Sequence, residues 1–253
     1  MMITMMIAIT MMVLLPPALS LAMPRILLTG GSGYIGSHTA VELLCRGYDV
    51  VVVDDLSNSK ELSCRRAIEI ASKQLTGGKL GELSFRRCDI RSEDDLSKVL
   101  SEFPDVRTCI HFAGLKAVGE SSVIPTEYYD VNVGGSVNLL KCMKRHGVRN
   151  VVFSSSATVY GDPQELPVTE KARSGVTSSV YGRTKWFVEE IIRDEVRCGD
   201  GINALILRYF NPIGAHPSGE IGEDPKGELV SFSLLVRSFV PVVGPDLLDL
   251  LMM

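Results

Sequence analysis

Short runs of apolar residues alternate along the chain with stretches in which apolar positions recur every three or four residues. The apolar runs are typical of strands buried on both faces, and the longer pattern is typical of helices packed against them. We expect strands near residues 26–28, 50–53, 83–90, 108–112, 150–153 and 204–208. Helices are expected over residues 35–44, 61–75, 93–103, 126–146 and 181–197. This alternation predicts an α/β fold with a doubly wound parallel sheet.

A glycine-rich turn joins the first strand to the first helix. The stretch Thr29–Gly36 contains two overlapping patterns, one starting at Gly30 and one at Gly31, and both continue through Gly33 and Gly36. Glycines in such a turn allow the sharp change of direction, the close approach of a pyrophosphate and the packing of helix on strand. The phosphates would lie on unpaired N–H groups at the positive end of the helix. We therefore predict a Rossmann-like dinucleotide site.

A carboxylate at the end of the second strand refines this prediction. Asp54 closes the run of four valines and lies 18 residues after Gly36. At that place a carboxylate accepts hydrogen bonds from the ribose hydroxyls of the adenosine. The same charge would repel a 2′-phosphate, so NAD is favoured over NADP.

Three groups supply candidate chemistry. Tyr181 and Lys185 lie four residues apart and therefore share one face of a helix. An ammonium near a phenol favours the phenolate, so we expect the pKa of Tyr181 to fall from about 10 toward working pH. Ser156, at the end of the fifth strand, is placed to hydrogen-bond a substrate hydroxyl, and Lys116 follows the fourth strand.

Two shorter features belong to the same edge of the sheet. Asp89 and Ile90 close the third strand, where the carboxylate either accepts a hydrogen bond from the adenine amino group or caps the next helix. Both readings stay open. Ala113 and Gly114 are small residues at the carboxyl end of the fourth strand, where cofactors lie against open parallel sheets.

Composition excludes some classes of partner and leaves the compartment open. The net charge of −4 gives no basis for binding nucleic acid, and we predict no metal site. The six cysteines are widely spaced, which permits disulfides but is more typical of reduced core thiols.

Residues 1–22 are uncharged and apolar, with a proline pair at Pro16-Pro17 and a small-x-small stretch at Ser20-Leu21-Ala22. A secretory signal normally has a positive start, and the proline pair interrupts a spanning helix. We expect an apolar extension before a fold that starts at Met23, in a cytoplasmic protein without a membrane partner. A signal peptide for the secretory pathway is the alternative.

Longer motifs give the chain a family resemblance. Thr29–Gly36, His111–Ser121, Phe153–Gly161, Tyr181–Lys185 and Leu207–Gly219 closely resemble the UDP-glucose 4-epimerases, which belong to the extended short-chain dehydrogenase/reductases. The resemblance implies an isomerase of galactose metabolism that moves hydride from C4 of a UDP-sugar to NAD. A 4-keto sugar then turns over, and the hydride returns to its opposite face. The implied partners are UDP-galactose and UDP-glucose.

The resemblance also implies roles for individual residues. Tyr181 looks like the catalytic base, Ser156 its hydrogen-bonding partner and Lys185 a ribose ligand. The residues that resemble NAD contacts are Gly30, Gly33, Tyr34, Ile35, Gly36, Asp54, Asp55, Leu56, Ser57, Asn58, Asp89, Ile90, Phe112, Ala113, Gly114, Lys116, Asn132, Ser154, Tyr181, Lys185 and Phe210. Those that resemble substrate contacts are Lys116, Ser156, Ala157, Thr158, Tyr181 and Asn211.

Two positions distinguish this chain from a related class, the nucleotide-sugar dehydratases. Eliminating water needs an acid and a base, usually an Asp-Glu pair directly after the Ser or Thr that ends the fifth strand. Ala157 and Thr158 stand there instead and cannot do that work. The epimerase resemblance is therefore preferred.

The resemblance runs from about residue 23 to residue 227, which predicts an NAD-binding domain with the start of a substrate lobe. Residues 228–253 form a divergent, apolar tail, so the smaller substrate lobe is expected to be largely missing. Two hypotheses follow: a working UDP-sugar epimerase, or an NAD-binding protein without activity. A homodimer through the helices after the fourth and fifth strands is a further expectation from the family.

Overall fold

One seven-stranded sheet organises the protein, and the computed structural model describes residues 23–199, 201–224 and 238–242 of it. The strand order is β3-β2-β1-β4-β5-β6-β7. Six strands are parallel: β1 (Arg25–Thr29), β2 (Val50–Asp54), β3 (Leu83–Arg87), β4 (Val106–His111), β5 (Asn150–Ser156) and β6 (Asn203–Tyr209). The order reverses between β1 and β4, and at such a switch point ligands bind in a crevice at the carboxyl ends of the strands.

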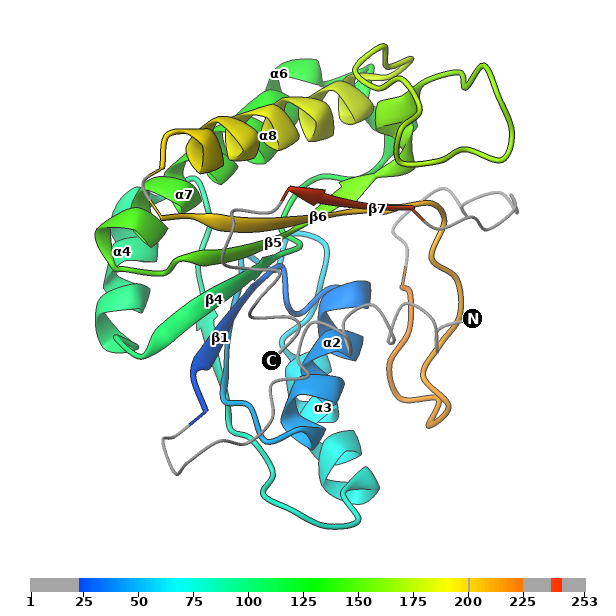
Figure 1. Cartoon of the computed structure of the whole chain (residues 1–253). Helices are drawn as coiled ribbons and strands as arrows, with labels where there is room; N and C mark the ends of the chain where they lie inside the picture. Colours follow the sequence, from blue (N-terminus) through cyan, green and yellow to red (C-terminus); the bar gives the residue numbers. More distant parts are fainter. Residues whose placement is uncertain (1–22, 200, 225–237, 243–253) are drawn as a thin grey trace.

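Helices cover both faces of the sheet (Figure 1). On one face lie α2 (Tyr34–Cys45) and α3 (Leu62–Gln74). On the other lie α4 (Glu93–Glu102), α7 (Gly135–Arg145) and α8 (Val180–Arg197). The sequence prediction of a Rossmann-like, doubly wound sheet is confirmed.

The central strands β1 and β2 are largely apolar because each face of the sheet has its own core. Leu27 contributes to the core shared with α4, α7 and α8, while Ile26 and Leu28 contribute to the core shared with α2 and α3. All three side chains are buried, as is the whole of Val50–Asp54 in β2. Burial on both faces removes the alternation of polar and apolar residues that an exposed sheet face would show.

The expected helix over 126–146 is interrupted. It consists of α6 (Pro125–Tyr128), the wider π-helical turn η1 (Tyr129–Gly134) and α7. The N–H of Gly135 bonds the carbonyl five residues back, at Asp130, which marks the wider turn. A Cβ at Gly135 would meet Ile90 Cδ1 at 2.5 Å, so the glycine lets the helix pack closely on Ile90, and a side chain there would force Ile90 to shift.

Three shorter elements were not expected from the sequence. These are α5 (Val118–Ser121), the 3₁₀ turn η2 (Ala157–Tyr160) and β7 (Ser238–Val242). β7 lies within the divergent tail and pairs antiparallel with β6, from Ala204↔Val242 to Arg208↔Ser238. Short segments such as these carry too few residues for a periodic pattern. The rest of the tail and the apolar extension over residues 1–22 lie outside the described residues, and so do Pro225, Lys226 and Gly227.

All six cysteines are free thiols, as the spacing predicted. Cys64, Cys88, Cys109 and Cys142 are buried, whereas Cys198 is exposed and so is not a core residue. Among the described residues, no helix combines the length and the apolar character needed to cross a membrane.

Candidate active site

The glycine turn after β1 has a backbone conformation at Gly30 and a close backbone contact at Gly36 that side chains would prevent. Gly30 has φ +66°, in the left-handed region that favours glycine. A Cβ at Gly36 would lie 2.5 Å from the Gly30 carbonyl oxygen. The N-cap of α2 is Gly33, which has no side chain to cap the helix, and the first turn, with Tyr34 and Ile35, contains no acidic residue. The N–H groups of this turn therefore suit the phosphates of a dinucleotide.

Asp54 lies at the end of β2, within the same crevice. Its Oδ2 accepts a hydrogen bond from the Ser32 N–H at 3.0 Å, and its Oδ1 accepts from Leu56 N–H at 3.0 Å and Ser59 Oγ at 2.7 Å. A carboxylate has about four acceptor sites, so one remains for a ribose hydroxyl. Burial raises the pKa of Asp54, and the hydrogen bonds from Ser59, Leu56 and Ser32 oppose that shift.

The loop after β2 is held in a tight conformation. Leu56 has φ +64°, which is unusual for a residue with a side chain. Asp55 Oδ1 accepts hydrogen bonds from the N–H and the hydroxyl of Ser57 at 2.9 and 2.7 Å, and Asn58 is exposed beside them. The predicted residues 54–58 therefore form one preorganised loop at the crevice.

The two interpretations of Asp89 are separated by a neighbouring serine. The cap of α4 is Ser92, whose Oγ accepts from the Asp95 N–H at 3.3 Å. Asp89 Oδ2 instead accepts from Arg91 Nη2 at 2.7 Å and from Nε at 3.0 Å, while Oδ1 accepts from Nε at 3.2 Å. This hydrogen bonding lowers the pKa of Asp89. The helix-cap interpretation is wrong, and the carboxylate remains half-exposed at the sheet edge.

The loop after β4 brings small residues beside the crevice. A Cβ at Gly30 would lie 2.6 Å from the backbone nitrogen of Ala113, so the two loops are in close contact. Phe112 and Ala113 are half-buried there, and Gly114 is exposed. Lys116 is also exposed, and its Nζ pairs with Glu223 at 2.9 Å.

Asn132 lies in the π turn and is buried. Its Oδ1 accepts from the Leu115 N–H at 2.8 Å, and its Nδ2 donates to the Leu115 carbonyl and to Thr184 Oγ1, both at 3.0 Å. The amide therefore joins the β4 loop to α8. The sequence predicts that Asn132 contacts NAD, and that stays a prediction. The structure adds that Asn132 holds the β4 loop against α8 through these hydrogen bonds.

Ser156, Thr158 and Tyr181 form a chain of hydroxyl groups. Thr158 Oγ1 donates to Ser156 Oγ at 2.9 Å, and Ser156 hydrogen-bonds the Tyr181 hydroxyl. Since Ser156 also accepts from the Thr158 N–H at 3.2 Å, its own proton is left for Tyr181. Such a donor favours the phenolate. The half-buried Ala157 separates the two hydroxyl-bearing residues of β5 and η2.

The expected lowering of the Tyr181 pKa is wrong for this structure. Burial raises the pKa of Tyr181 to about 12, and the hydrogen bond from Ser156 opposes that rise. Lys185 Nζ lies 5.8 Å from the centre of the Tyr181 ring and donates to the Ser154 carbonyl at 2.9 Å. The four-residue spacing on the helix was predicted correctly, but no local pattern indicates how strongly the Tyr181 ring is desolvated. Burial also lowers the pKa of Lys185 to about 8.

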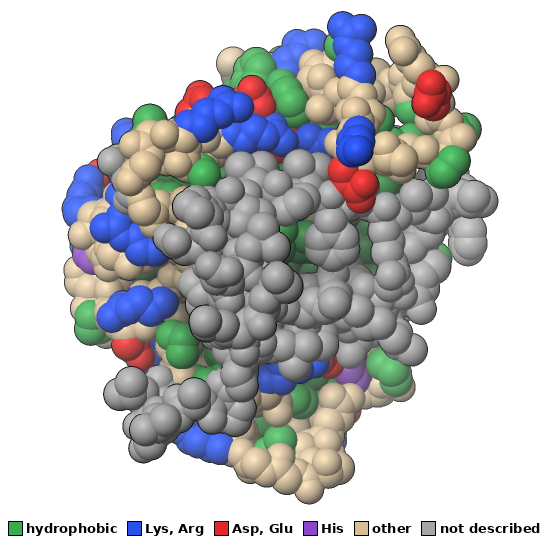
Figure 2. All heavy atoms as spheres, in the orientation of Figure 1, with side chains coloured by type: hydrophobic (Ala, Val, Ile, Leu, Met, Phe, Trp, Pro, Cys, Tyr) green, Lys and Arg blue, Asp and Glu red, His purple; other side chains and the backbone are tan. Residues whose placement is uncertain are grey.

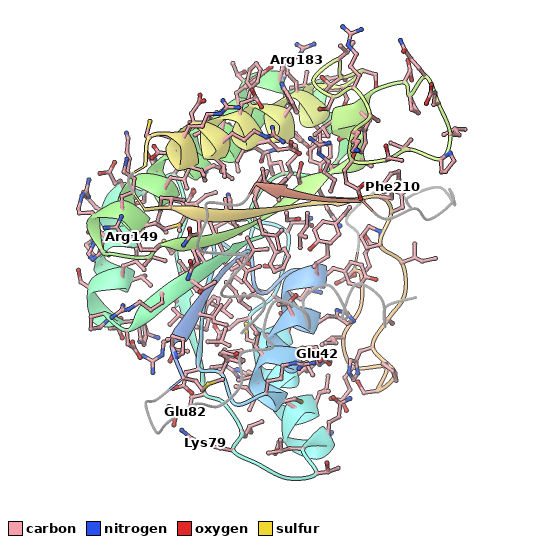
Figure 3. All side chains as sticks on the ribbon, viewed as in Figure 1. Glu42, Lys79, Glu82, Arg149, Arg183 and Phe210 are labelled. Carbon is pink, nitrogen blue, oxygen red and sulfur yellow. The ribbon has the colours of Figure 1, made fainter. Side chains whose placement is uncertain are left out.

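The next turn of α8 continues this attachment to β5. Glu189 is four residues after Lys185, is fully buried, and accepts a hydrogen bond from Ser155 Oγ at 2.5 Å. It also forms a two-oxygen pair with Arg208 of β6, at 2.6 and 2.9 Å. Tyr181, Lys185 and Glu189 thus form one stripe that meets the three serines of the β5 end, whereas Arg183 points away on the outer side of α8 (Figure 3).

The segment after β6 crosses over the α2 and α3 side of the molecule (Figure 1). Tyr34 donates from its hydroxyl to the Gly214 carbonyl at 2.6 Å, and Lys73 pairs with Glu220 at 3.1 Å. Phe210 leads into this segment at the end of β6 (Figure 3) and stacks on Tyr160 with ring centres 6.5 Å apart. Asn211 follows Phe210 and is half-buried.

Sequence reasoning did not find His111, Glu189 or Glu223 as parts of this region. His111 is hydrogen-bonded to Thr29 Oγ1 at 2.7 Å, and Glu189 accepts a hydrogen bond from Ser155 at the end of β5. Glu223 pairs with Lys116. Glu189 carried a signal, because it continues the four-residue spacing of Tyr181 and Lys185. The pairing of Glu223 with Lys116 spans 107 residues and had no local signal.

Comparisons with known proteins place this geometry in a family. The sequence model of the NAD dependent epimerase/dehydratase family matches residues 26–227. A UDP-glucose 4-epimerase of Schizosaccharomyces pombe is 52% identical over 207 residues, covering 80% of this chain and 55% of the relative. A UDP-glucose 4-epimerase of Mus musculus is 48% identical over 211 residues, covering 81% and 58%.

Solved structures agree. A UDP-glucose 4-epimerase of Bifidobacterium longum in complex with NAD+ and UDP superposes with a TM-score of 0.75 at 46% identity, covering 80% of this chain and 58% of that one. One from Stenotrophomonas maltophila, with bound NAD and formylated UDP-arabinopyranose, gives 0.76 at 42% identity, covering 83% and 59%. The chain therefore spans little more than half the length of these relatives. The family model spans the glycine turn, the serine-ended strand and the Tyr-Lys helix, and the chain belongs to the NAD dependent epimerase/dehydratase family.

Proposed function

We propose that this chain binds NAD in the crevice between β1 and β4 and acts on UDP-galactose and UDP-glucose as a 4-epimerase. The observation that carries the proposal is the meeting of Ser156, Tyr181 and Lys185 at the end of β5, beside the loops that carry Gly30 and Ala113. The relatives named UDP-glucose 4-epimerase, at about 50% identity, support the substrate class.

The residues present suit the cofactor. The Gly33 turn offers N–H groups for the phosphates, and Asp54 keeps one acceptor site for a ribose hydroxyl. Lys185 lies within the site with its ammonium directed to the Ser154 carbonyl, close to the β4 loop. When bound, NAD supplies the hydride acceptor and donor for the sugar carbon.

The protein's own contribution is the movement of one proton. The Tyr181 phenolate, which the hydrogen bond from Ser156 favours against the effect of burial, takes the proton of the sugar 4-hydroxyl and later returns it. Thr158 in turn donates to Ser156 at 2.9 Å, so three hydroxyl groups share the developing charge. Lys185 provides a positive charge 5.8 Å from the ring centre.

The test is a coupled assay for UDP-glucose formed from UDP-galactose by the purified chain. Turnover that disappears in Tyr181→Phe supports the proposal. The chain spans 55–58% of the length of these relatives, and a second candidate is an NAD-binding protein without turnover. Purified protein that retains NAD but shows no turnover would establish that second candidate.

We further propose a homodimer in the cytoplasm. The exposed apolar residues Val123 and Ile124 lie beside α5 and α6, and Phe187 is exposed on α8. Figure 2 shows apolar side chains next to Lys and Arg at the top of the molecule, over this region. Free thiols at all six cysteines suit a reducing compartment. Sedimentation velocity of the wild type and Phe187→Glu tests the dimer: a monomeric wild type would exclude it.

A further inference from the structure

A buried histidine connects the glycine turn to the helix that carries Tyr181. His111 is the last residue of β4 and is 2% exposed. Its Nδ1 lies 2.7 Å from Thr29 Oγ1, directly before the glycine turn, and its Nε2 lies 2.9 Å from Ser136 Oγ on α7. Both ring nitrogens are therefore engaged by hydroxyl groups on two different elements.

The direction of these hydrogen bonds is fixed by counting protons. Ser136 has one hydroxyl proton, and it donates this proton to the Asn132 carbonyl at 2.5 Å. Ser136 must therefore accept from His111 Nε2–H, which leaves Nδ1 as an acceptor for the Thr29 hydroxyl. Thr29 Oγ1 also accepts from the Ala113 N–H at 3.4 Å. The ring is thus held in the Nε2–H tautomer.

From Asn132 the connection continues to α8, the helix that carries Tyr181 and Lys185. The Asn132 side chain donates to Thr184 Oγ1 at 3.0 Å, and Thr184 donates to the Tyr181 carbonyl at 2.8 Å. Asn132 lies in the π turn η1, and π turns frequently mark functional sites. One line of buried polar contacts therefore runs from Thr29 through His111, Ser136 and Asn132 to Thr184.

We propose that His111 is a positioning residue that couples the glycine turn to the Tyr181–Lys185 helix, so that the two ends of the dinucleotide site are set together. The proposal rests on NAD binding in the proposed function. Thr29 adjoins the turn proposed to face the phosphates, and Thr184 is next to Lys185 on α8, so each end of the line adjoins a residue proposed to bind NAD. Burial and the nearby Lys185 ammonium lower the pKa of His111 to about 3, which keeps the ring neutral.

A double-mutant cycle on NAD affinity separates coupling from local packing. Thr29→Val and Thr184→Val each remove one hydroxyl while keeping the shape of the side chain. The control is Thr39→Val on α2, where a buried hydroxyl of the same kind donates to the Ile35 carbonyl at 2.9 Å, outside this line. Dissociation constants for NAD are measured by titration calorimetry for the wild type, the single variants and the pairs.

We expect each of Thr29→Val and Thr184→Val to weaken NAD binding about 5-fold, the equivalent of one hydrogen bond. The double variant should be about as weak as either single variant. Thr39→Val with Thr184→Val should show the product of its single effects within about twofold. Multiplicative effects for Thr29→Val with Thr184→Val would overturn the coupling, even though NAD binds.

A second measurement does not depend on the cofactor. The ¹⁵N shifts of the His111 ring in the folded wild type should report the neutral Nε2–H tautomer, and the Nδ1–H tautomer or an imidazolium would overturn the proposal. Exchange of the Leu115 N–H, which donates to Asn132, should speed up in Thr29→Val and not in Thr39→Val. If the wild type binds no NAD, the proposed function fails, and unchanged exchange in Thr29→Val would separately refute the coupling.

Discussion

The Glu189 carboxylate and the Arg208 guanidinium form a fully buried ion pair, 2.6 Å apart at their closest, directly beneath the end of β5. Ser155 donates to the same carboxylate, and Arg208 also lies 4.7 Å from the centre of the Tyr160 ring. The pair thus connects α8, β5, β6 and η2, the four elements around Ser156 and Tyr181.

Removing one charge of this pair should destabilise the protein strongly. Glu189→Gln leaves Arg208 buried without its partner, which typically costs about 3–5 kcal/mol. The neighbouring Glu190 is 44% exposed and pairs with Arg193, so Glu190→Gln should cost less than about 1 kcal/mol. Urea unfolding measures both. Equal midpoints for the two variants would contradict the importance of burial.

The hydroxyl chain at Tyr181 should be visible in the pH dependence of turnover. Ser156 lowers the pKa of Tyr181 against the rise caused by burial. Ser156→Ala should therefore move the acidic limb of the pH–rate profile, on which the rate rises as Tyr181 loses its proton, to higher pH and lower the rate about 10²-fold or more at neutral pH. Thr158→Val should move the limb in the same direction by a smaller amount. A limb that stays in place in Ser156→Ala would exclude Ser156 as the donor to the phenolate.

The glycine turn should tolerate no added methyl group at Gly36. A Cβ there would lie 2.5 Å from the Gly30 carbonyl oxygen, so Gly36→Ala should destabilise the protein by about 1–3 kcal/mol and weaken NAD binding. At Gly77 a Cβ meets nothing within 4 Å, and Gly77→Ala serves as the control with unchanged binding. Thermal melts and NAD titration check both variants, and wild-type affinity in Gly36→Ala would refute the tight turn.

His111 should make the protein sensitive to acid. Its pKa is lowered to about 3 in the fold, whereas an exposed histidine has a pKa of about 6.5. Between these values the unfolded chain binds a proton that the folded chain excludes. This contribution to stability is therefore complete above about pH 6.5 and is lost at about 1.4 kcal/mol per pH unit as the pH falls toward 3.

Urea unfolding between pH 7 and pH 4 measures this loss. His111→Gln has no titrating ring at this position, so its free energy of unfolding should fall less steeply over the same range. Parallel slopes for the wild type and His111→Gln would show that His111 is not buried in its neutral form.

Much of the fold and part of the site followed from local pattern. Periodicity and turn chemistry predicted the apolar strands, the glycine turn and the shared helical face of Tyr181 and Lys185, because each is set by residues close together in the sequence. The π turn at Asn132 did not follow, because the apolar spacing over residues 126–146 is that of one continuous helix.

The environment of the site residues was likewise beyond local pattern. The rise in the Tyr181 pKa depends on burial by several elements, and the Lys116–Glu223 pair joins residues far apart in the chain. The ion pair of Glu189 with Arg208 likewise joins two different elements, α8 and β6, and no local pattern indicates it. Sequence identified which groups are present, while folding determined how strongly each is desolvated and paired.

The central claim is that the crevice beside Gly30, Asp54 and Tyr181 holds a dinucleotide. Its most direct test is the mass and absorbance of the small molecule released by heat from the purified chain, with calorimetric titration of NAD if none is released. The account predicts NAD, either released in near-equal amount to protein or bound on titration. A chain that releases no nucleotide and takes up no added NAD would contradict it.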